Sequence, residues 1–361
     1  DALNSVTIAF EDTTVETSVG GYLALEFQAD LTSSPVSAAR CAFSTTTAHA
    51  VRFVGAVASS PAAFSDVVLT TASGFSRGMS FEATLTDSPV ALTDVTLNAY
   101  YLPFRQAGCV RSPLTFTNVV IKGQYGWYRG DTVVGVVDSP TTITGCTMTV
   151  AIRTTSISGP IRNSPFAIVD TTLVGGSHNG FEVASTLDSS PVTLTRCSFL
   201  GSAALYALLF TGAVTDSPLT LTDSAVTGGQ EVVRFSASVS GSPIVMSGSS
   251  LLSTDATGYS VLHVSGAIDA SPLTLHDTKI TTHITAGAGD GLHFASTATG
   301  SPVTCTKVAL VSGSAGIRYA AGNVRSDVSF AFGSVSAAEW FALASPDDVD
   351  VLIDSSHLKY N

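Results

Sequence analysis

The sequence predicts an all-β fold, a single-stranded parallel β-helix, on three observations. A Ser-Pro pair recurs every 24 to 30 residues through eleven copies, from Ser34-Pro35 to Ser301-Pro302. Two positions at fixed distances after the proline are apolar in every copy, and apolar and polar residues alternate ahead of the proline. A fixed period indicates stacked repeats, and alternation with period two inside each repeat indicates short strands.

The segment after each proline predicts two strands separated by a bend. The residues three positions after the proline are Ala38, Phe64, Leu92, Phe116, Ile143, Ile168, Leu194, Leu221, Met246, Leu275 and Cys305. The residues eight positions after it are Phe43, Leu69, Leu97, Ile121, Met148, Leu173, Phe199, Val226, Leu251, Ile280 and Leu310. Between these apolar columns stand many Asp, Asn and Gly residues, which suit a tight bend.

The segment before each proline predicts a third strand and a corner. Apolar residues alternate there in pairs such as Val51 and Phe53 or Val233 and Phe235. Proline cannot donate a ladder hydrogen bond, so its recurrence at one phase marks a corner between strands. The serine before it can bond local backbone at that corner. The Ser-Pro pairs therefore have a structural role rather than a catalytic one.

The repeat predicts one domain of about 13 coils of about 26 residues, because Ser5-Val6 and Ser326-Asp327 extend the series towards both ends. The β-helix is expected over residues 1–345, with an irregular tail or a partial coil at 346–361. Left-handed β-helices are built from hexapeptide triplets, which are missing here, so the right-handed form is predicted. We see no capping helix, and an uncapped ladder edge predicts self-association, end to end or lateral.

Composition limits the partners. A formal charge of -12 opposes nucleic-acid binding, and no apolar run is long enough for a membrane span. Only four lysines occur on a chain rich in hydroxyl groups, which favours an extracellular or cell-surface location. The positions of the five cysteines in the repeat place them too far apart for a disulfide, and they form no Cys-x-x-Cys pair. We therefore expect buried free thiols, and we expect neither a metal nor a cofactor.

Two surface patterns are candidate sites. Threonines two and four positions after the proline form a possible two-column array of Thr115, Thr117, Thr142, Thr144, Thr193, Thr195, Thr220, Thr222, Thr304 and Thr306. This array is similar to the ice-binding face of insect antifreeze solenoids, although threonine is also a common exposed strand residue.

The second candidate is a polar row that points outward from the third strand. It contains Arg234, His263 and His293, and earlier in the chain Glu26 and Arg52, which are expected to pair. The two histidines should lie one coil apart and could stack or share a metal. Two histidines without a positioned third ligand make a poor zinc site, so a solvated row is the simpler interpretation.

On these coils the chain resembles the right-handed parallel β-helix superfamily, the pectin-lyase-like fold, over nearly its whole length. That superfamily includes polysaccharide lyases and hydrolases, phage tailspikes, adhesins and repetitive surface proteins of microbes. Because no cluster of carboxylates breaks the repeat, the sequence favours a non-enzymatic structural or adhesive protein that forms a filament, stalk or surface layer. A carbohydrate-active enzyme or glycan-binding spike is the first alternative, and an ice-binding protein is the second.

Overall fold

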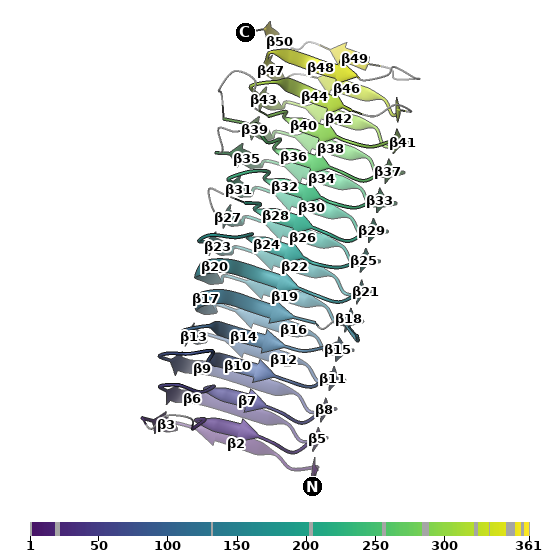
Figure 1. The fold of residues 1–361 in the computed structure, drawn as a ribbon. Coiled ribbons are helices and arrows are strands. Elements are labelled where there is room, and N and C mark those ends of the chain that lie inside the picture. Colours follow the sequence, from purple (N-terminus) through teal and green to yellow (C-terminus); the bar gives the residue numbers. More distant parts are fainter. Residues whose placement is uncertain are drawn as a thin grey trace. The chain divides into compact units, whose positions relative to one another are not determined.

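A computed structural model describes residues 2–18, 22–130, 133–201, 205–254, 258–283, 289–320, 324–331, 333–343, 351–354 and 357–360. The chain divides into two compact units, residues 1–176 and 177–361. Each unit consists of stacked parallel strands (Figure 1), and about 12 turns of about 26 residues are formed in all. The predicted all-β, single-stranded parallel β-solenoid is confirmed, while its handedness stays a prediction. In the described part of the chain, no helix is long and apolar enough to cross a membrane.

A column of two-residue strands lies just before the Ser-Pro pairs, and we call it the corner column. In the N-terminal unit it contains β1 (Leu3–Asn4), β5 (Leu31–Thr32), β8 (Val57–Ala58), β11 (Leu85–Thr86), β15 (Cys109–Val110), β18 (Val136–Val137) and β21 (Ile161–Arg162). In the C-terminal unit it contains β25 (Leu187–Asp188), β29 (Val214–Thr215), β33 (Val239–Ser240), β37 (Ile268–Asp269), β41 (Ala298–Thr299) and β45 (Val324–Arg325).

The first column begins directly after the proline. Its strands in the N-terminal unit are β2 (Ile8–Glu11), β6 (Val36–Thr45), β9 (Ala62–Thr71), β12 (Val90–Thr93), β16 (Leu114–Thr117), β19 (Thr141–Thr144) and β22 (Phe166–Val169). Those of the C-terminal unit are β26 (Val192–Thr195), β30 (Leu219–Thr222), β34 (Ile244–Ser247), β38 (Leu273–His276), β42 (Val303–Thr306), β46 (Val328–Ala331) and β49 (Val351–Asp354).

The second column follows the bend, and the long strands β6 and β9 run through that bend into it. The other members in the N-terminal unit are β3 (Thr14–Thr17), β13 (Thr96–Ala99), β17 (Val120–Arg129), β20 (Thr147–Ile157) and β23 (Thr172–Gly175). In the C-terminal unit they are β27 (Ser198–Leu200), β31 (Ala225–Gly228), β35 (Ser250–Ser253), β39 (Lys279–Thr281), β43 (Ala309–Val311), β47 (Ser334–Ala337) and β50 (His357–Tyr360).

The third column precedes the corner, and it includes the second halves of β17 and β20. Its other strands in the N-terminal unit are β4 (Leu25–Phe27), β7 (Val51–Phe53), β10 (Arg77–Phe81) and β14 (Leu102–Gln106). In the C-terminal unit they are β24 (Phe181–Val183), β28 (Leu208–Phe210), β32 (Val233–Phe235), β36 (Leu262–Val264), β40 (Leu292–Phe294), β44 (Ala315–Tyr319) and β48 (Glu339–Leu343).

The Ser-Pro corner is a ladder of buried side chains. The backbone N–H of Ser112 donates to Oγ of Ser139 at 2.9 Å, and that of Ser139 donates to Oγ of Ser164 at 2.9 Å. Each hydroxyl also donates to the carbonyl two residues earlier in its own coil, as Ser139 does to Val137 at 2.7 Å. Each serine hydroxyl therefore forms a hydrogen bond with backbone of its own coil and another with backbone of the coil before it. The predicted bond to local backbone is present, and the bond between coils adds to it.

The bend between the first and second columns is made by left-handed residues. Asp66, Asp94, Asn118 and Asp170 have φ between 51° and 55°, and Gly145 has φ 64° at the same phase. Asn and Asp tolerate this region better than other non-glycine residues, which explains why most copies have Asp, Asn or Gly five positions after the proline. Arg40, Arg196 and Lys307 adopt the same conformation in the remaining three copies.

The apolar columns form the core as the sequence predicts. In the N-terminal unit, the third column contributes a stack of phenylalanine rings, with centroids 4.6 Å apart between Phe27 and Phe53 and 4.5 Å between Phe53 and Phe81. Further along, the same inward position holds Gln106 and then Arg129, which pair in register. Both side chains are fully buried. The core is therefore irregular at β14 and β17.

All five cysteines are buried and free, as the sequence predicts. Cys146 belongs to a second ladder of buried side chains, six residues after the proline. Its Sγ accepts the backbone N–H of Val119, and its own backbone N–H donates to Oγ1 of Thr171, both at 3.3 Å. Burial raises the pKa of Cys146 to about 11 and that of Cys305 to about 12.

Parts of the predicted C-terminal tail continue the coil pattern. β49 pairs with β46, and β50 pairs with β47, both in parallel. The remaining tail residues, 346–350, 355, 356 and 361, lie outside the described part of the chain.

Candidate functional site

The predicted threonines occupy two adjacent outward rows of the first column. In the N-terminal unit, Thr115 pairs in register with Thr142, and Thr117 with Thr144. In the C-terminal unit, Thr193 pairs with Thr220, and Thr195 with Thr222, while Thr304 and Thr306 lie elsewhere in the same unit. Thr142 is exposed and the other members are half-buried. The array is interrupted at Ala167 and Val169 in β22, so it is only a few coils deep.

The polar row of the C-terminal unit is longer than predicted. Arg234, His263, His293 and Arg318 are successive register partners on β32, β36, β40 and β44. The two imidazole rings stack with centroids 4.7 Å apart and planes within 2°, which confirms that they lie one coil apart. A guanidinium group therefore flanks the histidine pair at each end.

A buried carboxylate holds one histidine of this row. Oε1 of Glu231 lies 2.5 Å from Nδ1 of His263, and Oε2 of Glu231 accepts a bond from Nη1 of Arg234 at 2.9 Å. The Glu231 side chain is only 3% exposed, so this carboxylate needs both partners. Nε2 of His263 lies 3.4 Å from Oγ of Ser265. Glu231 thus fixes the orientation of the imidazole and of Arg234 together.

A second buried carboxylate repeats the arrangement. Oδ2 of Asp290 accepts a bond from Nε of Arg318 at 2.9 Å and lies 3.3 Å from Nδ1 of His293. Oδ1 of Asp290 accepts the backbone N–H of Ala315 at 2.9 Å. Burial, together with the neighbouring His263, lowers the pKa of His293. Both causes favour the neutral form of this imidazole.

The row contains the groups that acid-base chemistry requires. Among the residues that the structure describes, no group of three or more His, Cys, Asp and Glu side chains is arranged to hold a metal ion. An imidazole oriented by a buried carboxylate can accept or donate a proton, and adjacent guanidinium groups can bind and neutralise a carboxylate. The row combines both functions on one face.

The third column of the N-terminal unit also carries a charged cluster. Glu26 and Arg52 form the predicted pair, with Oε1 and Nη1 at 3.2 Å. Glu82 accepts bonds from both Arg77 and Arg105, and these two cations hold the pKa of Glu82 below its usual value although burial opposes that shift.

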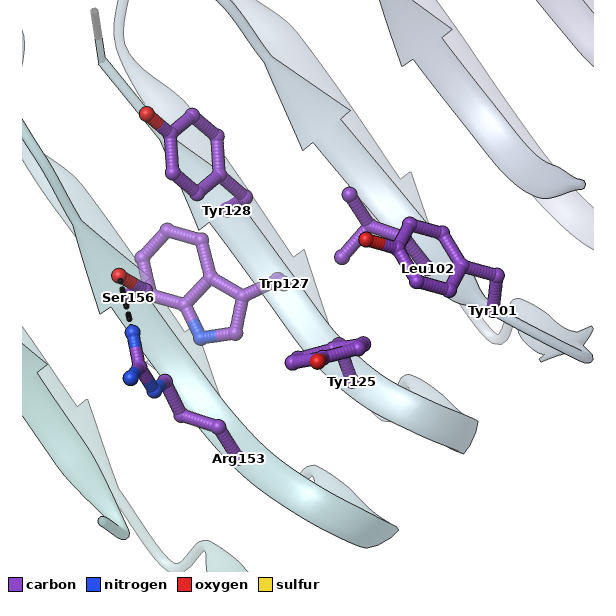
Figure 2. A pocket seen from close by; sticks show the side chains of 7 residues that line it. All are labelled: Tyr101, Leu102, Tyr125, Trp127, Tyr128, Arg153 and Ser156. Carbon is purple, nitrogen blue, oxygen red and sulfur yellow. Dashed lines mark hydrogen bonds between the residues drawn. The ribbon is translucent and has the colours of Figure 1, made fainter. Parts of the chain in front are cut away.

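Beside this cluster, the strands β14, β17 and β20 form a pocket (Figure 2). Its walls are Tyr101, Leu102, Tyr125, Trp127, Tyr128, Arg153 and Ser156. Sequence reasoning missed this site because it followed the regular columns. The sequence does contain one signal for this site, a local excess of aromatic residues. Four of the nine tyrosines and one of the two tryptophans fall between residues 100 and 128.

Sequence reasoning also missed Glu231, Asp290 and Arg318. Glu231 and Asp290 precede β32 and β40, at a phase where other coils have residues as different as His49, Leu102, Asn179 and Ser260, so the repeat gives no column that would reveal them. Both lie three residues before the arginine or histidine that they contact, and this spacing is the usable signal.

Comparison with known proteins gives likeness in fold. No family model matches the chain, and no curated protein matches it. Among solved structures, the periplasmic alginate epimerase AlgG is similar with a TM-score of 0.39 and 8% identity, covering 92% of this chain and 78% of AlgG. The A-module of the Azotobacter vinelandii mannuronan C-5 epimerase AlgE6 is similar with a TM-score of 0.36 and 9% identity, covering 98% of this chain and 91% of that module.

These comparisons correct one prediction. The sequence favoured a non-enzymatic protein because its coils are regular, but both of these similar solved structures are enzymes. Regular coils are therefore no ground for excluding an enzyme, and the prediction of a non-enzymatic protein is withdrawn. The physical reason is visible in the polar row, where the backbone repeats from coil to coil while the outward side chains do not.

Proposed function

We propose that the chain is a carbohydrate-active protein that acts on an anionic polysaccharide, with Arg234, His263, His293 and Arg318 as the reactive row. The observation that carries the proposal is the contact of His263 with the buried Glu231, flanked by guanidinium groups. With a proton on Nδ1 directed to Glu231, Nε2 of His263 is the basic nitrogen.

The reaction class that fits is removal of the proton next to a sugar carboxylate. Arg234 or Arg318 binds the carboxylate of a uronic-acid unit and stabilises the negative charge that develops on it. The C–H bond breaks, its proton goes to Nε2 of His263, and its electron pair moves into the carboxylate. Glu231 stabilises the imidazolium that forms. Return of the proton or loss of a neighbouring substituent would then complete the reaction.

The distribution of charge supports an anionic substrate. Of the 16 basic residues four are lysines, so 12 are arginines, although the chain carries a formal charge of -12. Seven of these arginines belong to strands of the third column, namely Arg52, Arg77, Arg105, Arg129, Arg153, Arg234 and Arg318. Two of the seven, Arg234 and Arg318, stand in the reactive row itself, and the other five belong to strands of the N-terminal unit. A polysaccharide substrate and a surface rich in hydroxyl groups support an extracellular or cell-surface location.

The test is proton exchange. Polyuronates of several linkages are incubated with the chain in D₂O, and proton NMR follows loss of the signal next to the carboxylate, while absorbance follows unsaturated ends. His263→Asn should slow exchange by about 100-fold or more, since general acid-base catalysis contributes that much. The control is His178→Asn, an exposed histidine of the same unit. Full activity in His263→Asn, or no reaction with any polyuronate, would overturn the proposal.

A further inference from the structure

We infer that the aromatic pocket of the N-terminal unit binds one uronic-acid unit of a polysaccharide, as a recognition site that takes no part in proton transfer. The polymer class rests on the proposed function, whereas the site itself rests on the pocket. Its volume is about 300 Å³. That size is at the lower end for small-molecule sites and suits a single sugar ring.

The strands explain why the pocket forms here. Tyr125 on β17 pairs in register with Arg153 on β20, and the pairing shifts by one residue between Gly123 and Tyr125. Such a bulge redirects the side chains that follow it. Ser156 accepts a bond from Nη1 of Arg153 at 3.3 Å, which orients the guanidinium along one wall. Figure 2 shows this bond, with Trp127 between Arg153 and Tyr128.

Aromatic rings provide the opposite wall. Tyr101 and Tyr125 meet edge to face with centroids 5.1 Å apart, and Tyr101 meets Phe75 in the same way at 5.2 Å. Phe75 is 81% exposed, and both tyrosines are half-buried. Exposed aromatic faces of this kind offer apolar area next to polar groups, as the C–H face of a sugar ring requires.

An unsatisfied donor points to a ligand oxygen. Trp127 is 1% exposed, and its Nε1 is buried without a hydrogen-bond partner among the described residues. A buried N–H group without a hydrogen-bond partner lowers the stability of the fold. A pocket that contains such a group is therefore expected to bind a ligand with a hydrogen-bond acceptor. In Figure 2 the indole nitrogen lies on the side of the ring that faces Arg153. An oxygen placed there would meet an N–H donor and a guanidinium group together.

The neighbouring charges make a carboxylate the best acceptor. The third-column cations of this unit that reach the surface are Arg52, Arg77, Arg105 and Arg153, and the acids among them are Glu26 and Glu82. Four positive and two negative charges leave a local excess of two positive charges on a chain of formal charge -12. A uronate offers both the carboxylate and the ring face that this pocket fits.

Binding can be followed at the pocket itself. Trp127 and Trp340 are the two tryptophans, so Trp340→Phe leaves Trp127 as the sole indole reporter. Titration of this variant with uronate oligosaccharides should change the fluorescence of Trp127, and neutral glucan oligosaccharides of equal length should not. An unchanged spectrum at saturating uronate, or an equal response to the neutral sugar, would overturn the inference.

Variants identify the two contacts. By calorimetry, Arg153→Gln should weaken uronate binding about 30-fold and Trp127→Phe about tenfold, because a charged and a neutral hydrogen bond are lost. Arg153→Lys should retain much of the affinity. Arg162→Gln, an exposed arginine on the corner column of the same unit, is the matched control and should bind normally. Equal losses in Arg153→Gln and Arg162→Gln would contradict a specific site.

The two proposals fail separately. A fluorescence change at Trp127 without proton exchange on any polyuronate would remove the proposed reaction and leave the pocket. Proton exchange that is lost in His263→Asn, with a silent Trp127 and normal binding by Arg153→Gln, would remove the pocket and leave the reaction.

Discussion

His49 shows how a single residue in the charged cluster of the N-terminal unit can set the response to acid. Its Nδ1 accepts the backbone N–H of Arg77 at 2.9 Å. Burial, then the charges of Arg77 and Arg52, lowers the pKa of His49 to about 4. The folded chain therefore keeps this imidazole neutral at a pH where the unfolded chain protonates it.

This difference predicts a loss of stability in mild acid. The unfolded state binds more protons between about pH 6.5, the unperturbed value, and about pH 4, so the free energy of unfolding falls as the pH falls through that window. One group contributes at most ~1.4 kcal/mol per pH unit, and less at a half-buried site. Denaturant unfolding of His49→Asn, which keeps an acceptor for Arg77, should show a flatter pH profile. An unchanged slope would contradict this account.

The serine ladder is the feature that matters at the scale of an element. Ser139→Ala removes the acceptor for the buried backbone N–H of Ser112 and should destabilise the chain by about 1–3 kcal/mol. Ser139→Cys should recover part of that loss, since Cys146 accepts a backbone N–H in the second ladder. Ser37→Ala, at an exposed strand position, is the control and should cost little. Chemical denaturation measures all three, and equal effects of Ser139→Ala and Ser37→Ala would refute the ladder's role.

The elements differ in how far the sequence predicts them. The sequence predicts columns such as Phe64, Leu92 and Phe116 because every coil needs an apolar side chain at the same inward position. These residues do pair in register. The contact of Glu26 with Arg52 and the stacking of His263 on His293 also follow from phase alone.

Residues that depart from the phase could not be predicted in this way. The pocket depends on a one-residue shift between β17 and β20, which changes the neighbours of Tyr125. Glu231 and Asp290 belong to connecting segments of unequal length, so their position relative to the polar row needs the folded backbone. The repeat therefore predicts the β-solenoid, whereas the residues of the candidate sites lie where the sequence departs from the repeat.

For the whole molecule, self-association stays a prediction. A parallel ladder can pair with a second chain wherever an outer strand leaves its N–H and C=O groups unpaired. Sedimentation velocity over a wide range of protein concentration should then show faster-sedimenting species as concentration rises. A single coefficient across that range would contradict it.

The serine corner also has a consequence for how such a chain can change. From Phe53 to Pro61 and from Val264 to Pro272 the third strand keeps a constant distance to the corner, whereas Val226 to Phe235 is shorter than Leu251 to Val264. In these coils the corner thus restores the frame of the next coil after connections of different length. Connections between the second and third columns are therefore natural grafting points, where new sequence could alter the rim of a site while the neighbouring coils keep their alignment.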